Sequence, residues 1–310
     1  MRVTYIESPN TLYRQLWSPV QNTALWLGWW LHDVIGADYV IDAFHAVQGS
    51  RHRVVFADEV VAIAPEIVPE APVAGLVGLM AKAREVTEGA PMGLEDRPLV
   101  SLLLAGPGDV PLLPAGTGAA DHVMRVGSGI VLSDAQPARC HVLVPDVGVV
   151  SGESPRQDHA PGLVSGGGFE GFPEEVLWTW YVVDQPVPPL PVYSPGEADE
   201  MLRHAVENST RMVESSGHSP GLVSFRGGAQ GVRLAVGSLA DAFGLPGVPP
   251  GVPTRSQRLM ARADTVAAII DLSTRSAGGA DLDPHLLPMM KAVRVARMVA
   301  VDYALRELVR

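Results

Sequence analysis

The chain has 310 residues, of which 47% are hydrophobic and 18% are charged, and this composition is typical of a folded protein rather than a disordered one. The net charge is −11 and no block of arginines is present, which argues against nucleic-acid binding, where contacts to phosphate dominate the affinity. Cys140 is the single cysteine, so an intrachain disulfide and a zinc site built on several cysteines are excluded.

No stretch of the sequence reaches the roughly 20 apolar residues of a membrane helix. The first residues lack the basic start and the apolar stretch of a secretory signal. We therefore expect a cytoplasmic protein that makes no contact with a membrane.

The N-terminal part is predicted to combine helices with a sheet. Helical periodicity is found over residues 10–17, 21–34, 37–49 and 73–88. Strand-like runs occupy Arg53–Ala57, Val60–Ala64, Leu99–Leu104, Gly129–Leu132, His141–Val144 and Val176–Val183. Short separations, such as those from Val54 to Ile63 and from Ile130 to Val144, favour hairpins, so we expect a mixed or antiparallel sheet.

Two glycine-containing segments resemble a nucleotide-binding loop but lack its context. Pro111 and Pro114 prevent a helix after Gly106–Asp109, and such a helix would be needed to hold a pyrophosphate. Residues 116–118 come closer, with a helix start at Ala119, but they lack the third glycine of the pattern. We predict a turn at both places and no cofactor-binding residue.

A run of prolines divides the chain. Residues 185–195 contain prolines at 186, 188, 189, 191 and 195, which is typical of an extended linker. We therefore predict a mixed α/β (α+β) domain over 1–184, a linker over 185–195 and an all-α helical bundle domain over 196–310.

The segment after the linker is predicted to be helical. Ser194-Pro195-Gly196-Glu197 is a capping box, with proline at the first helical position. Further helices are predicted at Ala229–Phe243, Thr254–Ser276 and Pro284–Val309, with a strand or an extended piece at Gly221–Phe225. Because Pro288 removes a helical hydrogen bond, the last helix has an alternative start near Leu287.

One helical face offers candidate metal ligands. Asp38, Asp42 and His45 are spaced i, i+4 and i+7 within a predicted helix, so they share one face. Carboxylates and an imidazole suit a divalent metal if another segment completes the site. An exposed acidic helix face would give the same pattern, and both interpretations stay open.

Two segments offer candidate catalytic residues. Residues 217–221 match G-x-S-x-G, with Ser219 as nucleophile and His218 beside it. The nucleophile elbow of hydrolases needs a strand before the serine and a helix after it. Here a helix is predicted before it, so a glycine-terminated helix is the alternative. Residues 149–173 form a long segment without periodicity, which is uncommon unless it is functional; its candidates are Asp158, His159 and Glu170.

The six tryptophans are Trp17, Trp26, Trp29, Trp30, Trp178 and Trp180. We expect them to pack N-terminal helices against the sheet. A groove for a protein partner is the alternative, because tryptophan is favoured at interface anchors.

Several of these features together resemble a group of uncharacterised actinobacterial proteins. They are the tryptophan-bearing N-terminal helix, the G-P-G-D turn that ends Leu102–Asp109, the H-V-L-V-P run at His141–Pro145, the tryptophan-containing strand before the linker, and the two C-terminal helices rich in arginine and alanine. The resemblance implies the same domain division and a bacterial cytoplasmic setting. It assigns no activity and no catalytic residue.

We expect a non-catalytic protein that binds a protein partner or assembles as a homo-oligomer, because no catalytic motif stands in its proper context. The alternative is an enzyme or a metabolite-binding protein with a site near the glycine-rich loop 151–172, either with or without a metal.

Overall fold

The fold is seen in a computed structural model. It describes residues 20–93, 96–148, 175–185, 187, 193–215, 228–274 and 283–309. The elements are, in chain order, α2 (Thr23–Leu31), α3 (Ala37–Gln48), β1 (His52–Phe56), α4 (Asp58–Ile63), a 3-10 turn (Pro65–Ile67), α5 (Gly75–Thr87), β2 (Val100–Leu104), α6 (Gly118–Val126), β3 (Ser128–Ser133), β4 (Arg139–Gly148), β5 (Glu175–Asp184), α7 (Pro195–Ser215), α8 (Gly228–Phe243), α9 (Thr254–Thr274) and α10 (Asp283–Glu307). The predictions for 10–17 and 221–225 lie outside these residues.

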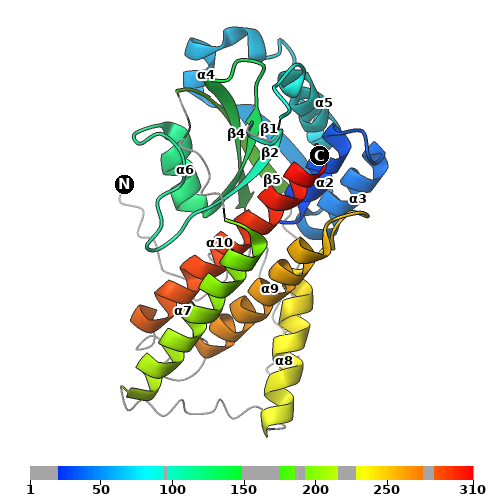
Figure 1. Cartoon of the computed structure of the whole chain (residues 1–310). Coiled ribbons are helices and arrows are strands. Elements are labelled where there is room, and N and C mark those ends of the chain that lie inside the picture. Colours follow the sequence, from blue (N-terminus) through cyan, green and yellow to red (C-terminus); the bar gives the residue numbers. More distant parts are fainter. Residues whose placement is uncertain are drawn as a thin grey trace, which may run out of the picture.

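The strands of the described residues form one sheet in the order β1-β5-β4-β3-β2 (Figure 1). Strands β2 to β5 pair as antiparallel neighbours, whereas β1 joins the edge parallel to β5. The predicted combination of a mixed sheet with a helical C-terminal part is therefore confirmed. The hairpin predicted between β3 and β4 is confirmed as well, with Ile130 opposite Leu143.

The prediction of a strand at residues 60–64 is wrong, because residues 58–63 form helix α4. Val54 and Ile63 are therefore not opposite each other in a hairpin. The β-branched residues of this run favour a strand by propensity. However, Asp58 and Glu59 occupy the first turn, where negative charge interacts favourably with the helix dipole, and α4 packs against β5.

The turn predicted at residues 116–118 is present at Gly116, and helix α6 begins directly after it at Gly118. The side-chain oxygen of Thr117 accepts a hydrogen bond from the Ala120 N–H at 3.2 Å, and so caps the helix. Gly127, with φ of 90°, ends the helix in the left-handed conformation that favours glycine. Both signals are present in the sequence.

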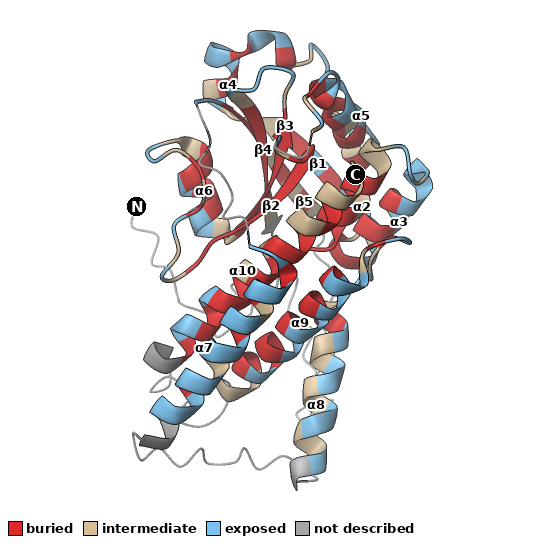
Figure 2. Cartoon of the chain, in the orientation of Figure 1, coloured by how far each residue is buried: buried red, intermediate tan, exposed pale blue. Residues whose placement is uncertain are grey.

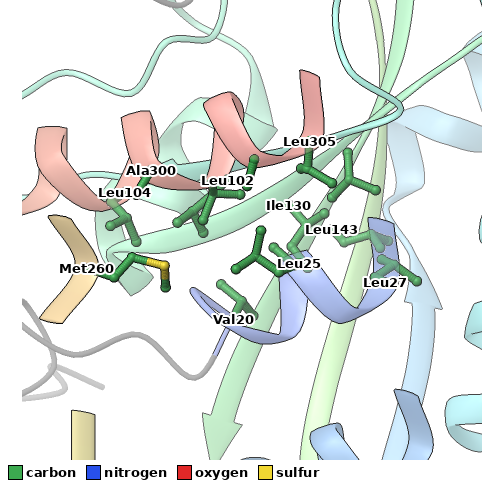
Figure 3. Packing of buried hydrophobic residues seen from close by; sticks show 14 of the residues in the cluster. Val20, Leu25, Leu27, Leu102, Leu104, Ile130, Leu143, Met260, Ala300 and Leu305 are labelled. Carbon is green, nitrogen blue, oxygen red and sulfur yellow. The ribbon is translucent and has the colours of Figure 1, made fainter. Parts of the chain in front are cut away.

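The larger hydrophobic core lies on one face of the sheet, under α2, α3, α5 and α10. Figure 3 shows Leu25 of α2 and Leu305 of α10 close to Leu102 and Ile130 of the sheet. All five residues of the edge strand β2 are buried, and α10 packs on this strand, so the edge is not open to another strand. A smaller cluster on the opposite face lies under α6.

Three tryptophans are part of the larger core. Trp29, Trp178 and Trp180 are at most 1% exposed, so the expected core role is confirmed for them. Trp26 and Trp30 are half-buried. Trp17 lies outside the described residues.

Helices α7, α8, α9 and α10 form the part that we call the helical arm, which extends away from the sheet (Figure 1). The predicted capping box is present at its start. The Ser194 N–H donates to Glu197 Oε2 at 2.7 Å, and the Glu197 N–H donates to Ser194 Oγ at 3.2 Å. Helix α10 begins at Asp283 and continues through Pro288, so the alternative start near Leu287 is wrong. A proline this near the helix start removes one hydrogen bond, and the buried apolar face beyond it offsets that loss.

Polar contacts from α2 and from Asn22, the residue before it, hold the segment between α8 and α9. Asn22 Nδ2 donates to the Gly244 carbonyl at 2.6 Å. The indole N–H of Trp26 donates to the Gly247 carbonyl at 3.1 Å, and that of Trp29 donates to the Pro250 carbonyl at 2.9 Å. The first described helix therefore satisfies backbone carbonyls that lie more than two hundred residues later in the chain.

A buried arginine attaches α10 to the turn after β2. Arg294 is 1% exposed; its Nε and Nη2 donate to Asp109 Oδ2 at 3.0 and 2.7 Å. Lys291 Nζ lies 3.2 Å from Asp109 Oδ1. A Cβ at Gly106 would lie 2.8 Å from Arg294 Nη1, so glycine leaves room for the guanidinium. The G-P-G-D turn thus positions the C-terminal helix.

The division of the chain at residues 185–195 stays a prediction. The larger hydrophobic cluster includes side chains from both sides of that segment.

In the part of the chain that the structure describes, no helix has both the length and the apolar character needed to span a bilayer.

Candidate functional site

Helix α8 lies at the side of the helical arm and packs on α9. Of its described side chains only Ala242 and Phe243 are fully buried. In Figure 2 most of α8 is coloured as intermediate or exposed, in contrast to the buried sides of α9 and α10. Most of the surface of this helix is therefore left uncovered by the described residues.

One continuous stripe of α8 is exposed, and we call it the outward face of α8. It consists of Gln230, Arg233, Leu234, Gly237, Ser238 and Asp241. The Leu234 side chain is 66% exposed. A Cβ added at Gly237 would meet no atom within 4 Å. The face therefore presents one large apolar side chain next to a position without any side chain.

Other apolar side chains of the helical arm are also exposed. Met201 and Met212 of α7 are 37% and 47% exposed, and Ile269 of α9 is 43% exposed. Methionine adapts to irregular partner surfaces because its side chain is flexible and polarizable. These residues extend the accessible apolar surface of the arm beyond α8.

A chain of polar side chains lies on the sheet face that α6 covers. His122 of α6 is 4% exposed; its Nδ1 lies 2.9 Å from the Tyr181 hydroxyl and its Nε2 lies 2.7 Å from Asp146 Oδ2. Asp146 is on β4 and Tyr181 is on β5. The Asp146 carboxylate is 43% exposed, so the chain runs from a buried hydroxyl to an accessible acid.

This arrangement sets the roles of the donors and acceptors. A carboxylate accepts, so Nε2 of His122 carries the proton toward Asp146, and Nδ1 accepts from the Tyr181 O–H. Burial, with a further contribution from the charge of Glu59, raises the pKa of Tyr181 above its ordinary value. The phenol is therefore held in its protonated form, as a donor to His122.

Two further histidines are held in the core by tryptophans. The indole N–H of Trp178 donates to His52 Nδ1, and that of Trp180 donates to His141 Nδ1, each at 3.1 Å. His141 Nε2 lies 2.9 Å from Asp134 Oδ2. Burial lowers the pKa of His52 and His141 below the ordinary value, so both rings are neutral and act as structural links.

A polar cavity of about 210 Å³ lies at the turn between β3 and β4, and its lining includes Arg97, Asp134, Arg139 and Cys140. Arg139 Nη1 is within 3.2 Å of Glu66 Oε1. Burial raises the pKa of the Cys140 thiol to about 11, so the sulfur is protonated and a poor nucleophile at neutral pH.

The metal-ligand candidates lie on α3. Asp38 and Asp42 are exposed and His45 is half-buried, and the His45 ring stacks on that of His52 with centroids 6.0 Å apart. Among the described residues, no group of three or more histidine, cysteine, aspartate or glutamate side chains is arranged to hold a metal ion.

The candidate catalytic residues are not described in the structure. Asp158, His159, Glu170, His218 and Ser219 all lie outside the described residues. Sequence reasoning did not identify Asp146, His122 and Tyr181, because they come from three separate elements and one of these, α6, was not among the predicted helices.

The architecture and these surfaces define a protein with a mixed sheet, a helical arm and an accessible helix at the side of that arm. The chain belongs to the Rv1486c-like family, since the model of the N-terminal domain matches residues 21–192 and that of the C-terminal domain matches residues 196–298.

Two relatives come from Mycobacterium tuberculosis, the uncharacterized protein MT1533 of strain CDC 1551 / Oshkosh and the uncharacterized protein Rv1486c of strain ATCC 25618 / H37Rv. Each is 26% identical over 299 residues, which cover 92% of this chain and 96% of the relative. No solved structure matches the chain. The resemblance to an uncharacterised family is confirmed.

Proposed function

We propose that this protein works through protein–protein contacts of its helical arm and catalyses no reaction itself. The observation that carries the proposal is the position of α8, a 16-residue helix covered by α9 along one side. Val232, Ala235, Val236 and Leu239 are half-buried there, and Leu234 points away at 66% exposure. A helix gains most of its stability from covering its apolar side chains, so a partner on α8 would add to what α9 provides.

Photocrosslinking in living cells tests this proposal. A photoreactive amino acid replaces Ser238 on the outward face of α8. The control variant carries the same amino acid at Val77, which is 65% exposed and belongs to α5, at the opposite end of the molecule from α8 (Figure 1). We expect one discrete adduct from position 238 and none of that size from position 77. Equal patterns from both positions, or no adduct, would contradict the proposal.

A second candidate function is ligand binding or catalysis near the glycine-rich loop 151–172. The favouring observation is the hydrogen-bonded chain of Tyr181, His122 and Asp146, because β4, which carries Asp146, ends at Gly148, shortly before that segment in the sequence. An accessible carboxylate backed by a histidine is a suitable acceptor for a polar ligand or for a proton.

Native mass spectrometry of the full chain, with metal analysis in parallel, tests the second candidate. A copurified molecule that is lost in Asp146→Asn and Tyr181→Phe would support a site at the polar chain. A metal that is lost in Asp42→Ala or His45→Ala would instead support the row on α3. A mass equal to that of the bare chain, with no metal, would contradict both sites.

A further inference from the structure

The spacing of four residues on the outward face of α8 is the same in both directions along the helix. Gln230, Leu234, Gly237 and Asp241 are spaced 4, 3 and 4 residues apart, and at these spacings all four lie along one line of the helix. In an antiparallel pair of two such helices, the first position of one helix faces the fourth of the other, and the second faces the third.

Such a pair contains two equivalent contacts, and in each of them a large side chain faces a glycine. Leu234, 66% exposed, would face Gly237 of the second copy. Gly237 has open space where a Cβ would be, so the leucine can enter between the turns of the opposing helix. By two-fold symmetry the same contact forms at both ends of the pair.

The charges on this face match those of a reversed copy. Gln230 would face Asp241 of the second copy. Arg233 lies about one turn after Gln230 in the same helix. Its side chain leans toward the helix N-terminus, which brings the guanidinium toward Asp241 of the second copy. Neither Arg233 nor Asp241 forms an ion pair with another residue among those that the structure describes. Each copy thus offers one cation and one anion that the other complements.

We infer that the partner of α8 is a second copy of this chain, held by an antiparallel α8–α8 pair around Leu234 and Gly237. This inference rests on the proposed function, since it names the partner of the same surface. One helix pair is smaller than a standard stable interface, so the association is concentration-dependent.

Sedimentation velocity of the full chain over a concentration series measures this association, and Gly237→Gln is the main variant. Glycine is the poorest helix former other than proline, and a Cβ at this position meets no atom of its own chain within 4 Å. The variant therefore folds at least as well as the parent chain. We expect its dissociation constant to rise about tenfold or more, because glutamine fills the space that Leu234 needs.

Charge reversal gives a second, independent readout. Arg233→Asp and Asp241→Arg are each expected to weaken the dimer, and the double variant is expected to restore it. Val77→Asp on α5 is the matched control and leaves the association unchanged. Failure of the double variant to recover, with both single variants weakened, would overturn the arrangement described here.

The crosslink at position 238 separates the two proposals. An adduct of twice the mass of the chain supports the self-pairing. An adduct with a different protein, together with a monomer in sedimentation, overturns the self-pairing and leaves the proposed function in place. A monomer at every concentration with no adduct overturns both.

Discussion

His141 links two strands and a loop through hydrogen bonds that need a neutral ring. It accepts from Trp180 through Nδ1 and donates to Asp134 through Nε2, and it is 0% exposed. A protonated ring would carry a proton on both nitrogens and would lose the bond from the Trp180 indole. Because the ring must stay neutral to keep both hydrogen bonds, the stability of the core depends on pH.

We predict that the free energy of unfolding falls as the pH drops below the ordinary histidine pKa of 6.5. Burial lowers the pKa of His141 in the folded protein. The unfolded chain therefore binds a proton first, and stability is lost from about pH 6.5 downward until the folded ring also titrates. Each such group contributes a slope of up to about 1.4 kcal/mol per pH unit.

Urea denaturation at about pH 7.5, 6.5 and 5.5 measures this dependence. His141→Gln keeps an amide that can donate to Asp134 but does not titrate, so it removes part of the slope even though its absolute stability is lower. A slope in the variant that equals that of the parent chain would show that His141 does not carry the effect.

Two glycines inside helices have opposite surroundings. A Cβ at Gly28 of α2 would lie 2.2 Å from Leu305 Cδ2 of α10, whereas a Cβ at Gly237 of α8 meets nothing. Leu305 is 1% exposed and belongs to the larger core, so it has little freedom to move aside. Packing therefore requires glycine at position 28 of α2, whereas packing within the chain places no such requirement on position 237 of α8.

We predict opposite signs for the two alanine substitutions. Gly237→Ala stabilises the monomer by about 0.5–1 kcal/mol through helix propensity alone. Gly28→Ala makes the same propensity gain but destabilises the protein by about 1–2 kcal/mol net, because it overpacks the core at Leu305. Chemical denaturation at low protein concentration gives both values. Stabilisation by Gly28→Ala would indicate that Leu305 repacks freely.

Helix periodicity and capping signals predicted the elements with a clear amphipathic pattern, including α2, α3, α5 and the capped start of α7. The wrong prediction of a strand at residues 60–64 has a physical cause. The β-branched run in α4 favours a strand in isolation, and only its packing against β5 and its acidic first turn select a helix. Helix α6 was not among the predicted helices, although Thr117 as its N-cap and Gly127 at its end mark its bounds in the sequence.

The polar chain at His122 could not be predicted from the sequence. Asp146 and Tyr181 share a sheet face only because Asp146 pairs with Leu177 in an antiparallel register that places both side chains on the side of α6. That register follows from the whole sheet and not from any local pattern. The outward face of α8, in contrast, is visible in the sequence once the helix is placed, since its spacing is local.

At the scale of the whole molecule, the sheet and the helical arm share one core. Apolar residues of α9 and α10 belong to the same cluster as those of α2 and the sheet. Asn22, Trp26 and Trp29 bind carbonyls of the segment after α8. The arm therefore depends on the N-terminal part for both apolar and polar contacts.

We predict that residues 193–310 expressed alone do not unfold cooperatively. Removal of the N-terminal part exposes the apolar face of α10 that covers β2 and deprives Arg294 of its hydrogen bonds to Asp109 and the Pro107 carbonyl. Circular dichroism during urea denaturation would show a broad, shallow transition compared with the full chain. A sharp transition with a similar midpoint would instead establish the helical part as an independently folding domain.

The contact between β2 and α10 also bears on how the chain reaches its native state. The Leu104 N–H meets Met298 Sδ across 194 residues of sequence, so the edge strand is synthesised long before the helix that covers it. During that interval Leu102 and Leu104 lack their cover and the strand edge is open to pairing with other chains. Contacts of such large sequence separation also slow folding. The nascent chain is therefore most prone to aggregation between the synthesis of β2 and that of α10, and this is the interval in which binding to a chaperone would help it most.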